Sequence, residues 1–245
     1  TQKLTSPYAL FFILMTPMLK AFGYLTALKV VVSLAVVGIP MSALYFMRVF
    51  NPDNWEWAFV SFIFVYTFHF EYGFISYVLG LPLVLCGLAL FWRLTQDRLS
   101  IRLQIASALV AALVYLSHVI NIIALCVGAG ILIATIIVDS RQGKTDGRSP
   151  LMVIGQLILV FLPAIVLAVI FFVQLLYSDV PIGRTLAAIE YRSVFHQLQG
   201  PIRVFFSIKP MFDLVMAGFV FGSVAMLLLL KKSRWLGGFP FWLGI

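Results

Sequence analysis

Long apolar runs, separated by short polar connections, make up most of the chain. A helix that crosses a bilayer needs about 20 apolar residues. Runs of this length occupy residues 24–47, 72–92, 151–177 and 211–230. The stretch 101–138 is almost continuously apolar, too long for one crossing, and interrupted only at Ser117, His118 and Asn121. The pattern therefore predicts two helices that meet at these three polar residues.

Two shorter apolar runs need a different interpretation. Residues 7–19 contain two prolines and are followed by Lys20, which is typical of a helix lying at the membrane surface. Residues 55–68 are also short, and we expect them to cross a locally thin part of the bilayer. Pro163 lies inside the third long run and predicts a kink there, because proline removes a helical hydrogen bond.

The predicted fold is an all-α, polytopic transmembrane bundle of about seven crossings, with a surface helix and a further, truncated helix. The chain begins at Thr1 and stops at Ile245 inside a new apolar run, so we expect a piece of a longer protein. We treat residues 1–245 as one helical domain. Its parts are an outer surface helix (1–23), a helical core (24–177), an outer loop (178–210) and C-terminal helices (211–245).

Composition supports a lipid environment and excludes several function classes. The chain is 62% hydrophobic and 11% charged, whereas soluble domains carry about 25% charged residues. Its net charge of +8 then marks cytoplasmic loops and not a nucleic-acid partner, because no soluble basic face is visible. Cys86 and Cys126 both lie in apolar runs and are interpreted as small core residues, with a disulfide as the alternative.

The basic residues set an orientation in the cell (inner) membrane. The short connections 93–102, 139–150 and 231–234 carry Lys and Arg, whereas 69–71 and 117–121 carry neither. Because cytoplasmic loops are enriched in Lys and Arg, the three basic connections are predicted to be cytoplasmic. The connections 69–71 and 117–121, which lack Lys and Arg, and the long loop 178–210 are then predicted to face the outside of the cell.

This orientation brings the candidate site residues to one outer face. Ionisable groups near membrane segments are costly to keep, so they are candidates for function. The candidate catalytic residues are Glu71 and Glu190. The candidate substrate-binding residues are His69, Tyr72, Ser117, His118, Asn121, Arg184, Tyr191, Arg192, His196 and Arg203. The three histidines come from separate segments, so their spacing predicts no metal site, and the identity of any divalent cation stays open.

Each candidate also has a structural interpretation. Glu71 can be a solvated turn residue, and the stretch 190–192 can be ordinary solvated loop. His118 can cap a helix or bond a neighbouring carbonyl, and the pair Ser117 and Asn121 can satisfy backbone groups where two helices join.

The order of several short motifs resembles the GT-C class of membrane glycosyltransferases. Ser6-Pro7-Tyr8-Ala9-Leu10 stands where that class has a His-Pro-Pro-Leu-like surface helix, although Ser-Pro-Tyr differs from His-Pro-Pro. Ala21-Phe22-Gly23 and then Tyr45-Phe46-Met47-Arg48 follow in the same order as the class's Phe-Gly turn and basic helix end. The stretch 70–81 and the later Ser117-His118 are similar to a group of bacterial multi-pass proteins with this plan.

The resemblance implies transfer of a sugar from a polyprenyl-phosphate donor on the outer side of the membrane. It implies that the main catalytic acid precedes Thr1, on a first outer loop. An anionic phosphate needs basic partners, for which Arg184, Arg192 and Arg203 are available. An acceptor hydroxyl needs a carboxylate base, the role assigned to Glu71 or Glu190.

Two other function classes remain open on the sequence. A transporter or channel component would use His69, Glu71 and His118 as a polar pathway or proton relay. A non-catalytic membrane scaffold would use none of these residues chemically.

Overall fold

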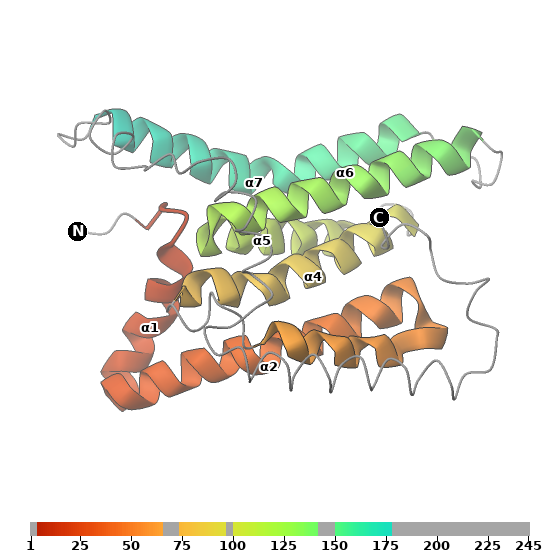
Figure 1. Cartoon of the computed structure of the whole chain (residues 1–245). Helices are drawn as coiled ribbons and strands as arrows, with labels where there is room; N and C mark the ends of the chain where they lie inside the picture. Colours follow the sequence, from red (N-terminus) through yellow and green to blue (C-terminus); the bar gives the residue numbers. More distant parts are fainter. Residues whose placement is uncertain (1–3, 66–73, 97–99, 142–149, 178–245) are drawn as a thin grey trace, which may run out of the picture.

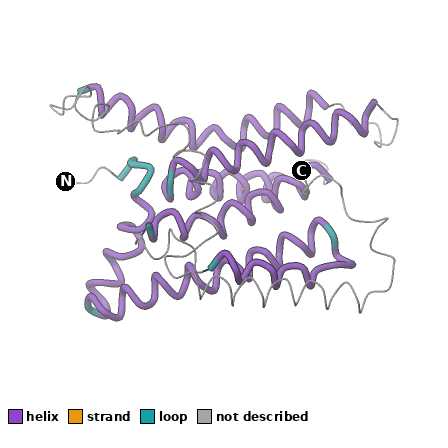
Figure 2. Tube along the Cα trace, viewed as in Figure 1, coloured by secondary structure: helices purple, strands orange, loops and turns teal. Residues whose placement is uncertain are grey.

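The computed structural model describes residues 4–65, 74–96, 100–141 and 150–177, and each regular element among them is a helix (Figure 2). The elements are α1 (Ala9–Phe22), α2 (Tyr24–Phe50), η1 (Pro52–Phe64), α4 (Ile75–Gln96), α5 (Ile101–Ser117), α6 (Val119–Arg141) and α7 (Pro150–Leu176). The all-α prediction is confirmed for the part of the chain that the structure describes.

The long helices run side by side, and α1 crosses one end of them (Figure 1). Helix α2 packs against both η1 and α4, and α4 in turn packs against α5 and α6. Helix α7 covers α5 and α6. Consecutive helices alternate in direction, so one end of the bundle holds the start of α4 and the α5–α6 junction.

Helix α4 joins two apolar clusters into one structure. Its first half contributes Val78 and Leu79 to a cluster with α1, α2 and Val65, the residue that follows η1. Its second half contributes Phe91 and Leu94 to a cluster with α5, α6 and α7. A change that displaced α4 would therefore separate the two halves of the molecule.

Glycines let α4 and α6 approach closely along their length. A Cβ on Gly87 would lie 2.9 Å from a methyl carbon of Leu125, so the leucine of α6 occupies the space above that glycine. The arrangement is reciprocal, since Leu88 of α4 covers Gly128 of α6. Small residues serve this purpose in membrane helices, where close packing replaces the hydrophobic effect as the main attraction.

Within the described residues, four helices are long and apolar enough to cross a membrane: α2, α4, α6 and α7. Most of the large side chains on their outer surfaces are apolar, and α7 exposes such residues on most of its circumference. Lipid is the solvent that suits this surface, and helices satisfy their backbone groups internally there. These features indicate a multi-pass membrane protein.

The structure does not confirm the predicted number of crossings. Six were predicted between residues 24 and 177, and two of the corresponding elements are shorter than a full span. Helix α5 has 17 residues, or about 26 Å at about 1.5 Å per residue, against a hydrocarbon core of about 30 Å. The predicted crossing at 55–68 is instead a 3₁₀ helix, η1, with a break at Asn54. A total of seven crossings stays a prediction.

Proline and glycine positions explain two local features. Helix α7 bends near its middle in Figure 1, and Pro163 stands midway along its sequence, as predicted. Gly23 is the only residue between α1 and α2, with φ 75° and ψ 169°. Only glycine adopts this combination without strain, so Gly23 sets the sharp change of direction between the two helices.

The two ends of the bundle differ in chemistry. Arg48 lies in the last turn of α2, Arg93 in the last turn of α4, and Arg102 in the first turn of α5. We call this the arginine end. Arg48 stacks over the Trp55 ring at 5.5 Å from its centroid, and the Phe50 and Trp92 rings stack at 5.0 Å. Aromatic rings with basic side chains are typical of a membrane interface.

Replacement of Gly23 by Ala tests the turn between α1 and α2. Nothing lies within 4 Å of the added Cβ, so the cost comes from backbone strain alone, and we expect about 1–3 kcal/mol less stability. Thermal unfolding in detergent measures it. Gly130→Ala is the control, because it also meets open space but lies in a helix, where Ala is favoured over Gly. Equal stability of the two variants would contradict the claim that the backbone at position 23 strains any residue other than glycine.

Labelling of single cysteines tests the orientation. In a Cys86→Ala/Cys126→Ala background, Arg102→Cys should react with a membrane-impermeant maleimide only after the membrane is opened. Tyr177→Cys, at an 87% exposed position of the opposite end, should react in intact cells. Reversed accessibility would place the arginine end outside and refute the predicted topology.

Candidate functional site

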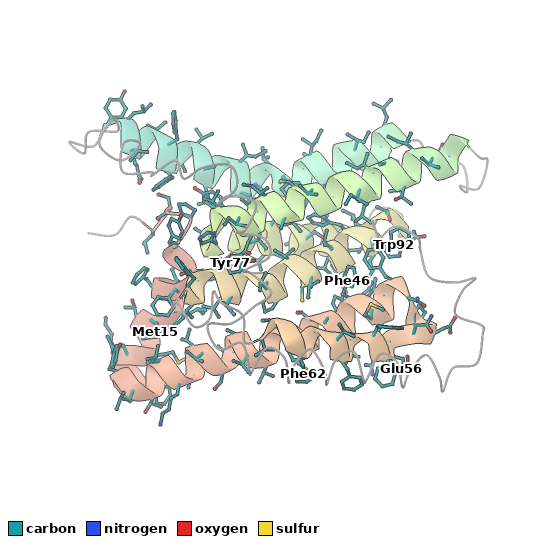
Figure 3. The ribbon with its side chains drawn as sticks, viewed as in Figure 1. Met15, Phe46, Glu56, Phe62, Tyr77 and Trp92 are labelled. Carbon is teal, nitrogen blue, oxygen red and sulfur yellow. The ribbon has the colours of Figure 1, made fainter. Side chains whose placement is uncertain are left out.

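Polar side chains gather at the end of the bundle crossed by α1. In Figure 3, Tyr77 lies toward this end, whereas Trp92 and Glu56 lie toward the arginine end. The centre of the polar end is the junction between α5 and α6, where His118 is the single residue between the two helices. We call this the His118 end. The backbone of His118 itself is extended, with φ −169° and ψ 145°.

His118 completes both helices that it separates. Its N–H donates to the Val114 carbonyl at 3.4 Å, and its own carbonyl accepts from Asn121 N at 3.1 Å. Its Nδ1 accepts from the N–H of Ile120 at 3.1 Å. An acceptor side chain in an extended residue just before a helix is an N-cap. The interpretation of His118 as a helix cap is therefore confirmed.

Two tyrosine rings stand edge-on to the imidazole. The Tyr8 ring lies 5.0 Å away at an interplanar angle of 80°, and the Tyr77 ring lies 5.5 Å away at 82°. Edge-to-face contacts of this kind are favourable for aromatic rings. Tyr8 precedes α1 and remains 45% exposed, so this side of the imidazole lies close to the protein surface.

Residues 5–8 tie three helices together across this end. The Tyr115 hydroxyl of α5 donates to the Thr5 carbonyl at 3.2 Å. The Thr5 hydroxyl donates to Oε1 of Gln174, near the end of α7, at 3.0 Å. These contacts join positions separated by 110 and 169 residues. They hold the segment that carries Tyr8 over the α5–α6 junction.

Asn121 links the α5–α6 junction to α4 through hydrogen bonds of its side-chain amide. Its Nδ2 donates to the Tyr77 carbonyl at 2.9 Å and to the Ser117 hydroxyl oxygen at 3.0 Å. The Ser117 hydroxyl donates in turn to the Val114 carbonyl at 2.7 Å. Both side chains are fully buried. Ser117 thus bonds a backbone group at the end of α5, as the structural interpretation of this pair expects, whereas Asn121 bonds a backbone carbonyl of α4 and the Ser117 side chain.

Gly80 of α4 makes room for this arrangement. A Cβ at Gly80 would overlap Nδ2 of Asn121 and Oγ of Ser117. The amide therefore reaches the Tyr77 carbonyl only because position 80 has no side chain. Within the described residues, Oδ1 of Asn121 and Oγ of Ser107 are buried without a hydrogen-bond partner. An unpaired buried acceptor costs about 1–3 kcal/mol, which makes Oδ1 of Asn121 a notable feature of the site.

The remaining nine candidates belong to other segments of the chain. His69, Glu71 and Tyr72 lie outside the described residues, as do Arg184, Glu190, Tyr191, Arg192, His196 and Arg203. Their convergence with His118 stays a prediction. Across the described ranges, no group of three or more His, Cys, Asp or Glu residues could hold a metal ion.

The site also contains residues that the candidate set omitted. Tyr8, Tyr77 and Gln174 were not among the candidates, yet the first two contact His118 and the third holds Thr5. Tyr8 did appear in the motif compared with the GT-C surface helix. For Tyr77 and Gln174 the sequence gives no local signal, because each lies within an apolar run and meets its partner only through folding.

No family model, curated protein or solved structure matches the chain. The resemblance to GT-C glycosyltransferases therefore depends on the short motifs alone.

Replacement of Gly80 by Ala tests the link between α4 and α6. The added methyl group displaces Asn121, so we expect a loss of about 2–4 kcal/mol from broken buried hydrogen bonds and strain. Thermal unfolding of the purified protein measures the change. Gly155→Ala is the matched control, because nothing lies within 4 Å of its added Cβ. Wild-type stability of the Gly80 variant would contradict this packing.

Proposed function

We propose that the chain belongs to an integral membrane glycosyltransferase of the GT-C type, which transfers a sugar from a polyprenyl-phosphate donor. The observation that carries the proposal is the His118 end, where a short helix crosses an otherwise apolar bundle above a group of polar side chains. Such an end suits a substrate with a polar head and a long apolar tail, because its head meets polar groups while its tail stays in lipid.

The crossing helix adds support from the motifs. A helix (α1) and a turn at Gly23 are formed by the residues whose motifs resemble the surface helix and Phe-Gly turn of the GT-C class, which supports the proposal. In Figure 1, α1 runs across the ends of the long helices, as a helix parallel to the membrane plane would. It is predominantly apolar, carries Lys20 in its last turn, and is 14 residues long, which is shorter than a span of about 20.

The proposed roles follow from the chemistry of the residues. Glu71 or Glu190 is the carboxylate that accepts a proton from the acceptor hydroxyl. Arg184, Arg192 and Arg203 neutralise the donor phosphate. Tyr8, Tyr77 and His118 contact the head group, since aromatic and imidazole side chains offer both a flat apolar surface and polar atoms. The main catalytic acid is expected upstream of Thr1.

Transfer of a labelled hexose from its polyprenyl phosphate, measured with the full-length protein in proteoliposomes, tests the proposal. Glu71→Gln should lower the rate by about 10²–10⁴-fold if this carboxylate is the base. Tyr8→Ala should lower it by about 2–10-fold through lost ring contacts.

Tyr24→Ala is the control for Tyr8→Ala, since Tyr24 is also an exposed tyrosine next to α1 and has no contact with His118 among the described residues. Absence of transfer by the wild-type protein with every polyprenyl-phosphate sugar tried would refute the proposed function. Unchanged transfer in the Glu71 and Tyr8 variants would remove both residues from the site.

A further inference from the structure

The arginine end carries exposed guanidinium groups on three helices that pack against one another. Helix α4 contacts both α2 and α5, and the three helices contribute Arg48, Arg93 and Arg102, whose side chains are all exposed. The lysines among the described residues, Lys20 and Lys29, lie instead in α1 and in the first half of α2. The arginine end therefore gathers the cation whose planar group can bind two oxygens of one phosphate.

Arg48 is held in place and keeps its hydrogen-bond donors. Its guanidinium carbon lies 5.5 Å from the centroid of the Trp55 ring, and this cation–π contact fixes the group against η1. The contact uses no acceptor atom. Within the described residues, the Arg48 side chain donates no hydrogen bond and forms no ion pair, so its N–H donors are available to an anion.

Arg93 brings a second positive charge to the same side of α2. Its Nη1 donates to the Tyr45 hydroxyl at 3.5 Å, and Tyr45 comes three residues before Arg48 in the helix. Side chains three residues apart on a helix are neighbours on its surface. The positive charges of Arg48 and Arg93 therefore belong to one surface.

The acidic side chains described at this end leave two of the arginines without an ion pair. Asp53 and Glu56 belong to η1, and Figure 3 shows Glu56 toward the arginine end. Both carboxylates, like Arg93, have contacts within the protein. Among the described residues, neither forms an ion pair with Arg48 or Arg102. The charges of these two arginines are therefore available to a partner.

The length of α2 brings Arg48 to the height of lipid head groups. The helix has 27 residues, or about 40 Å at about 1.5 Å per residue. The hydrocarbon core of a bilayer is about 30 Å thick, so the last turn of a helix of this length reaches the head-group layer. The stacked rings of Phe50 and Trp92, 5.0 Å apart, belong to the residue types that favour this layer.

We propose that the arginine end binds acidic phospholipids, with Arg48 and Arg102 donating hydrogen bonds to the phosphate oxygens of head groups that carry a net negative charge. Charge complementarity selects this partner. An acidic lipid presents an unbalanced anion in the layer where the arginines lie, and each basic residue near such a surface adds to the attraction. A zwitterionic lipid compensates its phosphate with its own ammonium group. The surface is distinct from the His118 end, so the proposal does not depend on the proposed function.

Titration of the full-length protein in detergent with dioctanoyl phosphatidylglycerol tests the proposal, with the melting temperature as readout. Phosphatidylglycerol should stabilise the wild-type protein at a lower concentration than dioctanoyl phosphatidylcholine does. Arg48→Gln and Arg102→Gln should each raise the half-saturating concentration of phosphatidylglycerol about fivefold. Lys20→Gln is the matched control, because it removes the same charge from an exposed side chain of α1, and it should leave that concentration unchanged.

Three outcomes would overturn the proposal. They are equal stabilisation by phosphatidylcholine, equal effects of the arginine variants and Lys20→Gln, and equal stabilisation by inorganic phosphate, which would assign the arginines to a free anion and not to a lipid. If an arginine variant does not fold, the wild-type protein still decides. Raising the NaCl concentration about tenfold should weaken its binding of phosphatidylglycerol, because salt screens exposed charges, and binding that salt leaves unchanged would also refute the proposal.

Discussion

The contact between α4 and α6 at Gly80 is the constraint on which the rest of the structure depends. Because Gly80 has no side chain, the Asn121 amide reaches across to a backbone carbonyl of α4. Further along the same interface, Leu125 and Leu88 fill the spaces above two other glycines. Helix α4 also belongs to both apolar clusters, so this interface fixes the two halves of the bundle relative to each other.

The same contact also holds the α5–α6 junction in place at the polar end of the molecule. A break between two helices leaves backbone groups without helical partners, and these groups are expensive to leave unpaired where water is scarce. Ser117 and His118 bond such groups from within the break, and Asn121 ties the break to α4 through Ser117 and the Tyr77 carbonyl. A junction built in this way holds its histidine in one orientation, which suits a residue that contacts a substrate. Structural and functional interpretations of these residues are therefore compatible.

Much of the fold could be predicted from the sequence, because apolar run length reports directly on burial in lipid. The break at residues 117–121, the long helices and the bend associated with Pro163 were all predicted from local pattern. The 3₁₀ geometry of η1 was not, since an apolar run of that length does not distinguish helix types. The convergence of the acidic residues and arginines on His118 stays a prediction from topology.

The sequence by itself determined the membrane character, the helical class and the location of the polar break, since each depends on residue type and spacing along the chain. Only the tertiary structure decided which residues surround His118. Tyr8 is 110 positions from it, and Thr5 meets Gln174 across 169 residues. Such contacts arise when α1 crosses the ends of the other helices, and the angle of that crossing depends on packing and on the backbone of Gly23. The local sequence marks a turn at Gly23, but it carries no information about the packing that sets the angle.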